Sequence, residues 1–354
     1  MLSSKKKNRK KTRKKKPSPL LLPPTTQSTQ IPDLPDDLLL SCFARVSRLH
    51  YPTLSLVSKR FRSLLASPEL YKTRSLLGHT ESCLYVYLRF YSDPNNLCWF
   101  TLCRRPNRNL TKTKKKQSSH LLVPITSPHS TPPFSSYTAV GSDIYEIGGH
   151  ISGMASSTVS VFDCRSHTWH KSPSMQVRRI NPDVKAIDGK IYVKGNIDYP
   201  NSDLVEVFDP KTQTWTYETN EWESLDGYYK SKEYISRSCL CEIDNVLYYN
   251  DRGVFKWLDT KVGYWRLLKG LSPNFLSYLE TSSLVHLADY GGKMAVLWDR
   301  LDHSSKCKER NVWCAVIALE RLSSDEIWGT LEWSEVVLKV PKSIQFVDVL
   351  SATV

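Results

Sequence analysis

The sequence contains no apolar run long enough to cross a membrane. Its first apolar cluster, Leu20–Leu22, is followed at once by Pro23 and Pro24, whereas a spanning helix needs about 20 mostly apolar residues. The basic run before this cluster is not followed by the apolar core of a secretory signal, so we expect no export signal and no membrane partner. Nine cysteines, an odd number, are scattered along the 354 residues. We therefore expect reduced, mostly buried thiols in a nuclear or cytoplasmic protein.

Familiar catalytic motifs are also missing. The sequence has no G-x-S-x-G, no P-loop, no H-E-x-x-H and no G-x-G-x-x-G, which are the signatures of common hydrolase, nucleotide and metalloprotease sites. His167 and His170 could form a metal pair, but a surface position at the end of a strand suits them better. Cys239 and Cys241 lack a second His or Cys pair at zinc-site spacing, so we interpret them as reduced thiols. We expect no catalytic residue, no metal and no cofactor.

Acidic residues are absent from the first 16 positions, which hold ten Lys or Arg residues. The net charge of the whole chain is +14, so only +4 is left for the rest, and no basic nucleic-acid-binding face is implied. Residues 1–30, basic and then rich in Pro, Thr, Ser and Gln, are expected to form a disordered tail. Lys5–Lys16 is either a nuclear localisation signal, a nonspecific contact for RNA or anionic lipid, or a solvated tail without a dedicated partner.

A small helical segment is predicted over residues 31–72. Pro35 suits the first turn of a helix, and the two aspartates that follow it favour a helix N-terminus. The apolar residues of this helix recur at i, i+3, i+4 and i+7 and form one stripe: Leu39, Cys42, Phe43 and Val46. Pro52 restarts the chain, Ser58 can cap a further helix, and Pro68 ends it. This segment has too little apolar surface to form a domain by itself.

The same segment resembles an F-box. The resemblance is carried by Leu34-Pro35, by Asp37-Leu38 and by the run from Leu54 to Lys59 followed by Phe61-Arg62. It covers about forty residues and implies docking to a Skp-type adaptor and, through it, to a cullin ubiquitin ligase. The residues that it implies for adaptor binding are Leu34, Pro35, Leu38, Leu56, Val57, Ser58 and Phe61. The alternative is an ordinary helical hairpin that caps a neighbouring domain.

From residue 136 the chain repeats itself. GSDIYEIGGH at 141–150 returns as DGKIYVKGN at 188–196, and VFDCRSHTW at 161–169 returns as VFDPKTQTW at 207–215. A third copy ends with KWLDTKVGYW at 256–265, and a fourth, looser copy ends at Trp333. In the first three copies an Asp precedes a Trp by six residues; these pairs are Asp163 and Trp169, Asp209 and Trp215, and Asp259 and Trp265.

Repeats of this length with several short strands each indicate a β-propeller with one blade per repeat. Each small sheet cannot cover both of its faces alone, so the sheets must stack around an axis. Aromatic-rich runs at Cys83–Phe90 and Leu97–Cys103 predict a hairpin, and two more strands are predicted near the C-terminus. We expect residues 73–354 to form a mainly β domain of five or six blades, one of them degenerate.

The repeats resemble the kelch repeat. Gly148-Gly149 at a strand end and the recurring Asp and Trp residues carry the resemblance, and they are implied to be structural. The second and third copies replace the double glycine by Lys194-Gly195 and Tyr249-Asn250, which leaves blade count and ring closure open.

From residue 31 onward the chain resembles the plant-type F-box/kelch-repeat family. That resemblance implies a non-catalytic substrate-receptor subunit of a Skp–cullin–F-box E3 ubiquitin ligase, which binds the adaptor through the F-box and an unknown target protein through the propeller. Two other functions stay open. One is a propeller with an enzymatic or small-ligand site, and the other is a protein-binding scaffold without a link to ubiquitin.

Overall fold

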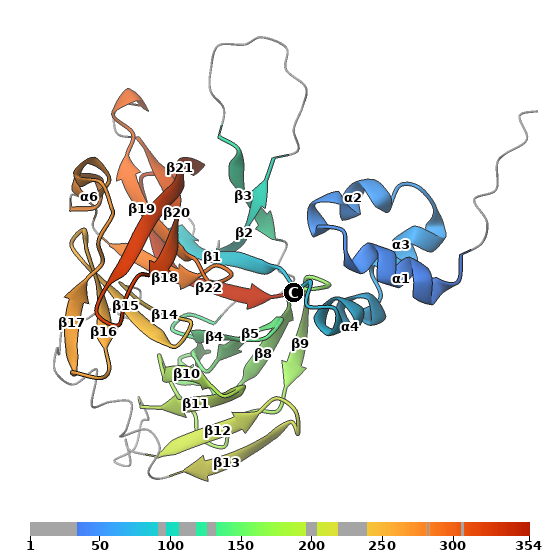
Figure 1. Ribbon diagram of the computed structural model, residues 1–354. Helices are drawn as coiled ribbons and strands as arrows, with labels where there is room; N and C mark the ends of the chain where they lie inside the picture. Colours follow the sequence, from blue (N-terminus) through green and yellow to red (C-terminus); the bar gives the residue numbers. More distant parts are fainter. Residues whose placement is uncertain are drawn as a thin grey trace, which may run out of the picture.

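The computed structural model describes residues 34–90, 97–105, 118–125, 132–195, 204–218, 239–280, 282, 284–305 and 308–354. Within them, a cluster of helices is followed by five four-stranded antiparallel sheets (Figure 1). The tail of residues 1–30 and most of the segment between the second and third repeats lie outside the described residues.

The helical cluster follows from its capping residues and a small apolar core. Its elements are α1 (Asp36–Ala44), the 3₁₀ helix η1 (Arg48–His50), α2 (Tyr51–Leu54), α3 (Lys59–Leu65) and α4 (Pro68–Leu76). The Ser58 hydroxyl accepts the N–H of Phe61 at 3.0 Å and so caps α3. Pro68, which the sequence predicts to end a helix, also begins α4. No helix among the described residues has the length and hydropathy that a membrane crossing needs.

The five sheets are the blades of a β-propeller. Blade 1 contains β1 (Ser82–Phe90), β2 (Leu97–Arg104), β3 (His120–Ile125) and β22 (Ile344–Thr353). Blade 2 contains β4 (Ser136–Val140), β5 (Asp143–Ile147), β8 (Val159–Asp163) and β9 (Thr168–Ser172), with a small hairpin of β6 (His150–Ile151) and β7 (Met154–Ala155) beside it. Blade 3 contains β10 (Asp183–Ile187), β11 (Lys190–Lys194), β12 (Val205–Asp209) and β13 (Thr214–Glu218).

The other two blades complete the ring. Blade 4 contains β14 (Leu240–Ile243), β15 (Val246–Asp251), β16 (Val254–Asp259) and β17 (Tyr264–Leu267), and α6 (Pro273–Glu280) follows it. Blade 5 contains β18 (Val285–Asp289), β19 (Met294–Leu301), β20 (Glu309–Arg321) and β21 (Ile327–Pro341), with η3 (His303–Ser305) between β19 and β20. The fold is therefore the mainly β propeller that the repeats predict, with five blades. Each of these blades has four strands, so none of them is the degenerate blade that the incomplete repeats suggested.

Blade 1 joins the two ends of the propeller. The C-terminal strand β22 pairs antiparallel with β1, from Ser82 opposite Thr353 to Phe90 opposite Ile344. Each sheet has one edge strand that contacts the edge strand of a neighbouring sheet; these strands are β4, β10, β14, β18 and β22. The contacts join β22 to β4, β4 to β10, β14 to β18, and β18 to β22. These five strands are therefore the inner strands around the axis. Blade 1 is completed by the C-terminal strand β22, which pairs with β1.

Apolar clusters join most neighbouring blades. One cluster spans blades 1 and 5, and others span blades 4 and 5, blades 1 and 2, and blades 2 and 3. Between blades 3 and 4 the described residues share no such cluster, because Tyr192, Val205 and Val207 pack only with a residue of blade 3. The junction between these two blades thus differs from the other four within the part of the chain that the structure describes.

The helical cluster is fastened to the end of the propeller where β1 begins. The buried Arg74 side chain pairs with Glu81 at 2.9 Å. Arg48 donates from its backbone N–H to the Glu81 carboxylate at 3.1 Å and from its guanidinium to the carbonyl of Cys164 at 3.3 Å. The Tyr71 hydroxyl donates to a carbonyl of the β8–β9 turn. These contacts place the helices beside the first residues of β1 and the C-terminus (Figure 1).

His286 on β18 is a buried polar side chain without a hydrogen-bond partner among the described residues. It is 1% exposed and packs against Phe346, with 4.8 Å between ring centroids. Burial lowers the pKa of His286 from 6.5 to about 4. The folded protein therefore holds this ring neutral across the whole range in which a histidine of the unfolded chain becomes charged.

This burial predicts a loss of stability in acid. Above about pH 6.5 the ring is neutral in both states and His286 has no effect. Below it, only the unfolded chain takes up the proton, so the free energy of unfolding should fall by about 1.4 kcal/mol per pH unit until about pH 4. The His286→Leu variant should lose less stability than wild type between pH 7 and pH 5 in urea-unfolding experiments. An identical loss in both proteins would contradict this assignment.

Candidate functional site

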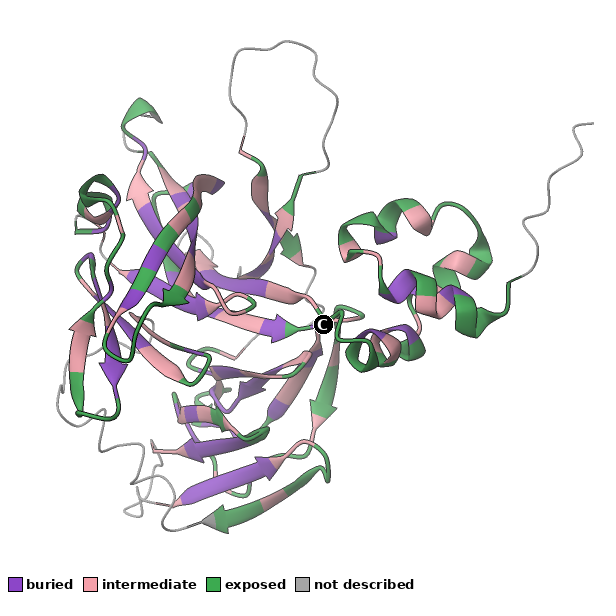
Figure 2. Cartoon of the chain, in the orientation of Figure 1, coloured by how far each residue is buried: buried purple, intermediate pink, exposed green. Residues whose placement is uncertain are grey.

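Four apolar residues of the helical cluster are exposed to solvent, and much of this cluster is coloured as exposed in Figure 2. Leu56 is 76% exposed, Val57 58%, Leu38 49% and Leu34 39%. The Arg60 guanidinium donates to the Leu34 carbonyl at 2.5 Å and pairs with a carboxylate at the start of α1 at 2.7 Å. Because Arg60 belongs to the first turn of α3, these bonds hold the start of α1 beside the start of α3. We call Leu34, Leu38, Leu56 and Val57 the helical apolar face.

The other three residues implied for adaptor binding have different settings. Pro35 is exposed at the N-cap position of α1, and Ser58 is exposed but is engaged in capping α3. Phe61 is half-buried and packs edge-to-face on Phe43, with 4.8 Å between ring centroids. Phe61 therefore contributes to the small core of the cluster, whereas the helical apolar face has no partner among the described residues of the propeller.

The repeated aspartates shape a turn that recurs in three blades. Asp163, Asp209 and Asp259 each end the third strand of a blade, and each Oδ1 accepts the backbone N–H two residues later at 2.8–3.1 Å. The residue four positions after each Asp has a positive φ of 56–73° and returns its N–H to the Asp carbonyl at 2.8 Å. These residues are His167, Gln213 and Gly263. The turn brings the Trp two residues later opposite the residue that precedes the Asp, which explains the constant spacing of six.

Charge supports two of these turns. An Arg165 hydrogen bond and charge lower the pKa of Asp163, although burial acts in the opposite direction. The Arg266 guanidinium donates to Asp259 at 2.7 Å and holds the pKa of that carboxyl below its ordinary value. Both carboxylates are therefore charged at neutral pH, which strengthens the backbone hydrogen bonds that they accept.

Two of the three repeated tryptophans contact the preceding blade. The Trp169 ring lies 6.4 Å from that of Trp99 in blade 1, and the Trp215 indole N–H donates to the carbonyl of Pro173, which follows blade 2, at 2.9 Å. Trp265 packs on a tyrosine of its own blade, with 5.7 Å between centroids. The third repeat thus lacks, among the described residues, the link to the preceding blade that the first two have.

Gly148 and Gly149 allow a neighbouring loop to pack closely against the backbone, where a Cβ atom would collide with it. Gly148 and Gly149 have φ values of +70° and +98°. A Cβ at Gly148 would lie 2.7 Å from the Arg179 carbonyl oxygen, and a Cβ at Gly149 would lie 2.5 Å from the Ser135 hydroxyl oxygen. The Gly149 N–H donates to the same Arg179 carbonyl at 3.0 Å. The double glycine therefore positions the loop that contains Arg179.

Gly148 and its counterpart Gly195 offer a matched test. Gly195 occupies the equivalent place in the next repeat and also has a positive φ, +80°, but no atom of the described residues lies within 4 Å of an added Cβ. Both alanine variants carry the strain of the left-handed conformation, and only Gly148→Ala adds a collision with backbone. We expect Gly148→Ala to lower the free energy of unfolding by about 1–3 kcal/mol more than Gly195→Ala, measured by urea unfolding. Equal losses would show that the collision is relieved without cost.

Arg179 and Glu206 form a fully buried ion pair behind this loop. Both side chains are 0% exposed, and the guanidinium donates to the carboxylate at 3.0 and 3.1 Å. Arg179 also donates to the carbonyls of Gly195 and Leu204 at 3.1 and 3.0 Å. The second carboxylate oxygen accepts the backbone N–H of Gln176 at 2.7 Å. The pair connects the loop before blade 3 to β12, and nothing in the repeat pattern pointed to it.

The two His and Cys pairs do not converge on a site. His167 Nε2 lies 3.3 Å from the Tyr85 hydroxyl, whereas His170 Nε2 lies 2.9 Å from the Thr168 hydroxyl. Burial raises the pKa of the Cys241 thiol, and the cysteines of the described residues are free thiols. Only Cys164 and Cys314 among them are fully buried, so the expectation of mostly buried thiols is wrong. Among those residues, no group of three or more His, Cys, Asp or Glu side chains is placed to hold a metal ion.

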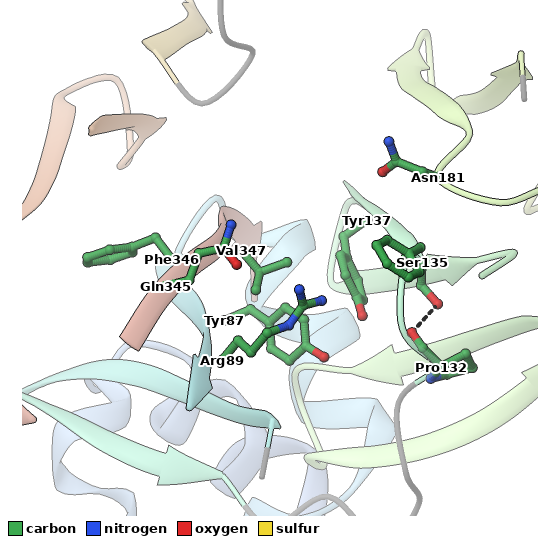
Figure 3. Close-up of a pocket in the computed structure, with 10 residues that line it drawn as sticks. Tyr87, Arg89, Pro132, Ser135, Tyr137, Asn181, Gln345, Phe346 and Val347 are labelled. Atoms are coloured by element: carbon green, nitrogen blue, oxygen red, sulfur yellow. Dashed lines mark hydrogen bonds between the residues drawn. The ribbon is translucent and has the colours of Figure 1, made fainter. Parts of the chain in front are cut away.

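A second candidate site is a cavity at the mouth of the propeller axis (Figure 3). Its volume is about 220 Å³, and it is lined by residues from β1, β22, β4 and the loops before β4 and β10. These residues are Tyr87, Arg89, Pro132, Phe134, Ser135, Tyr137, Asn181, Gln345, Phe346 and Val347. Sequence reasoning missed this group, because its members are brought together only by ring closure.

Family models cover both parts of the chain. The F-box domain model matches residues 31–73, and the model described as FKB95, Kelch-repeats domain matches residues 99–235 and 216–338. The two kelch matches overlap at 216–235, a range that begins within β13 and ends before β14. The described residues of blades 3 and 4 share no apolar cluster.

Curated relatives agree with the models. The chain is 48% identical to F-box/kelch-repeat protein At4g39550 of Arabidopsis thaliana over 383 residues, covering 94% of this chain and 96% of that protein. It is also 48% identical to F-box/kelch-repeat protein At5g51250 of the same plant, with 90% of this chain and 99% of that protein covered. A solved structure described as that of YjhT matches over 62% of this chain and 74% of its own chain, at 12% identity and with a TM-score of 0.29. On its F-box match, its kelch matches and these relatives, the chain belongs to the F-box/kelch-repeat family.

Proposed function

We propose that this protein is the substrate-receptor subunit of a Skp–cullin–F-box ubiquitin ligase. The observation that carries the proposal is the helical apolar face, which lies within the F-box match and which the propeller leaves uncovered. Leaving a Leu or Val side chain in water forgoes about 1.5–3 kcal/mol of burial free energy each. Several such residues exposed on one small helical cluster are typical of a surface that another protein covers. Its occupant in this proposal is a Skp-type adaptor.

The adaptor would bring the cullin ligase, and the propeller would bring the target protein. The chain itself then supplies proximity, which turns an encounter between enzyme and target into an effectively intramolecular step. The ion pair of Arg74 with Glu81 and the bonds of Arg48 support this role, because they hold the helices at a defined position on the propeller. A scaffold without a link to ubiquitin would be favoured if the propeller covered the helical apolar face, but these residues are exposed.

Reconstitution tests the proposal directly. The purified chain is mixed with a cullin in the presence and absence of a Skp-type adaptor, and capture of each partner is measured. We expect capture of the cullin only when the adaptor is present, because the adaptor bridges the two. Failure to capture the adaptor would refute the receptor role, and capture of the cullin without it would refute the bridging arrangement.

We further infer a nuclear or cytoplasmic location, with the basic tail as the determinant. Residues 5–16 carry the dense Lys and Arg run, which lies outside the described residues and which is typical of nuclear localisation signals. Deletion of residues 2–16 from a fluorescent fusion should lower the ratio of nuclear to cytoplasmic signal. An unchanged ratio would leave the tail without this role.

A further inference from the structure

The cavity at the mouth of the axis faces away from the helical cluster. Its lining residues lie at or just before the start of the inner strands β22, β4 and β10, and on β1. Arg89, one of the lining residues, lies near the end of β1. The helices attach at the other end of β1, beside Ser82. Ser82 and Arg89 are seven positions apart, which corresponds to roughly 23 Å along a strand that rises about 3.3 Å per residue. A protein bound at the cavity would therefore leave the helical apolar face accessible.

Arg89 supplies the charge of this cavity. None of the other nine lining residues is ionised at neutral pH, and among the described residues no carboxylate pairs with Arg89. Its guanidinium lies 6.0 Å from the centroid of the Phe134 ring, within reach of a cation–π contact. In Figure 3 the Arg89 side chain runs beside the Tyr87 ring, with its guanidinium between Val347 and Tyr137. The cavity thus combines one positive group with four aromatic side chains and the polar side chains of Ser135, Asn181 and Gln345.

Phe134 is held at the rim in a strained conformation. Its φ is +62°, in the left-handed region that bulky side chains rarely adopt, and its side chain is 53% exposed. The Asn181 backbone N–H donates to the Phe134 carbonyl at 2.7 Å and so fixes this position. Strained residues that persist because neighbours hold them cluster at ligand-binding sites. The exposed ring is therefore available to a ligand beside Arg89.

The floor of the cavity is fixed by a buried hydrogen bond. The Tyr137 hydroxyl donates to Glu146 Oε1 at 3.0 Å, and the Tyr87 ring packs edge-to-face on Tyr137 with 5.0 Å between centroids. Burial and then the charge of Glu146 raise the pKa of Tyr137, so its hydroxyl stays protonated and keeps donating to that carboxylate. Glu146 is itself 2% exposed and does not line the cavity. The floor presents aromatic surface to the cavity, and Arg89 is left to meet the ligand.

We propose that this cavity takes the carboxylate side chain of an acidic residue in an extended segment of the target protein, with Arg89 as its counter-ion. A planar guanidinium matches a carboxylate with two parallel hydrogen bonds, and the partial burial of Arg89 makes that pairing stronger than it would be in bulk water. Phe134 packs against the residue next to the acidic one. The inference rests on the proposed function, since it names the chemistry by which the receptor recognises its target.

Immobilised peptide libraries test the inference. Each has random flanking positions and one fixed central residue, which is Glu, Gln, Lys or phosphoserine. Binding is measured for the purified full chain, both without and with a Skp-type adaptor. We expect the Glu library to retain about tenfold more protein than the Gln library, which corresponds to about 1.4 kcal/mol. The preference should disappear in Arg89→Gln and should shift toward the Lys library in Arg89→Glu.

Arg300→Gln is the matched control. Arg300 also lies near the end of the second strand of its blade and over an aromatic ring, 5.2 Å from the Tyr278 centroid, but it does not line the cavity. This variant should keep the preference for Glu. Equal retention by the Glu and Gln libraries, or an equal loss in Arg300→Gln, would overturn the inference. Stronger retention by phosphoserine than by Glu would replace the carboxylate by a phosphate and would also overturn it.

Two readouts separate this inference from the proposed function. Capture of the adaptor is measured for each variant, and thermal unfolding confirms that each is folded. A protein that prefers the Glu library but does not capture the adaptor would refute the receptor role and leave the cavity assignment intact. A protein that captures the adaptor with no preference among the libraries would refute the cavity assignment alone.

Discussion

Replacement of Leu56 by Asp is expected to weaken binding of a Skp-type adaptor by about 100-fold or more. Leu56 is 76% exposed and belongs to the helical apolar face. A covered leucine contributes about 1.5–3 kcal/mol of burial free energy, and a carboxylate in its place would have to lose its hydration at the same interface. Isothermal titration of the purified chain with the adaptor measures the change, since a factor of 100 corresponds to about 2.7 kcal/mol.

Leu322→Asp provides the control for this prediction. Leu322 is 54% exposed and lies between β20 and β21, on blade 5 rather than on the helices. It therefore makes the same chemical change without touching the helical apolar face. Exposed substitutions of this kind usually alter the free energy of unfolding by less than about 0.5 kcal/mol, so both variants should remain folded. Unchanged adaptor affinity in Leu56→Asp, or an equal loss in Leu322→Asp, would contradict the proposed role of the face.

Replacement of Arg179 by Ala is expected to destabilise the propeller by about 3–5 kcal/mol. The change leaves the Glu206 carboxylate buried without its counter-ion, and removal of one partner of a buried ion pair typically costs this much. It also removes the donors to the carbonyls of Gly195 and Leu204. The loss should appear as a lower midpoint of urea unfolding, followed by tryptophan fluorescence.

The comparison variant is Lys293→Ala. Lys293 pairs with Glu332 on the surface of blade 5, where the two side chains are 44% and 35% exposed. Exposed pairs contribute about 0–1 kcal/mol because water already solvates both charges. The double variant Arg179→Met/Glu206→Leu separates charge from packing, since it removes both charges together and should recover part of the stability lost in Arg179→Ala. Similar midpoints for Arg179→Ala and Lys293→Ala would show that the buried pair has no special importance.

The local pattern of the sequence predicted more of the fold than of the candidate sites. The spacing between Asp209 and Trp215 predicted a repeated unit, and the structure gives the reason, because a single Asx turn sets the register of the third and fourth strands. The match from Leu34 to Arg62 predicted the helical segment in the same way. Both depend on residues that are close in sequence, whose geometry a short motif is enough to define.

The pairing that closes blade 1 and the residues that line the cavity could not be predicted from short motifs. The pairing of Ser82 with Thr353 joins the two ends of the propeller, and no periodicity in either strand specifies its partner. Arg89, Tyr137 and Gln345 line one cavity only because β1, β4 and β22 meet around the axis. Burial was equally hidden, since Phe61 and Leu56 belong to the same motif, yet Phe61 packs on Phe43 while Leu56 faces solvent.

The sequence by itself determined the order of the helices and strands, the resemblance to F-box and kelch-repeat proteins, and the turns that repeat from blade to blade. It did so because hydrophobic spacing, capping residues and turn chemistry act over a few neighbouring residues. Only the tertiary structure decided that Arg179 and Glu206, 27 positions apart, form a buried ion pair. It also decided that β22 pairs with β1 to complete blade 1, and that Arg89 lines one cavity with Tyr87, Phe134 and Tyr137. Those features depend on the packing of distant segments, which local preference does not encode.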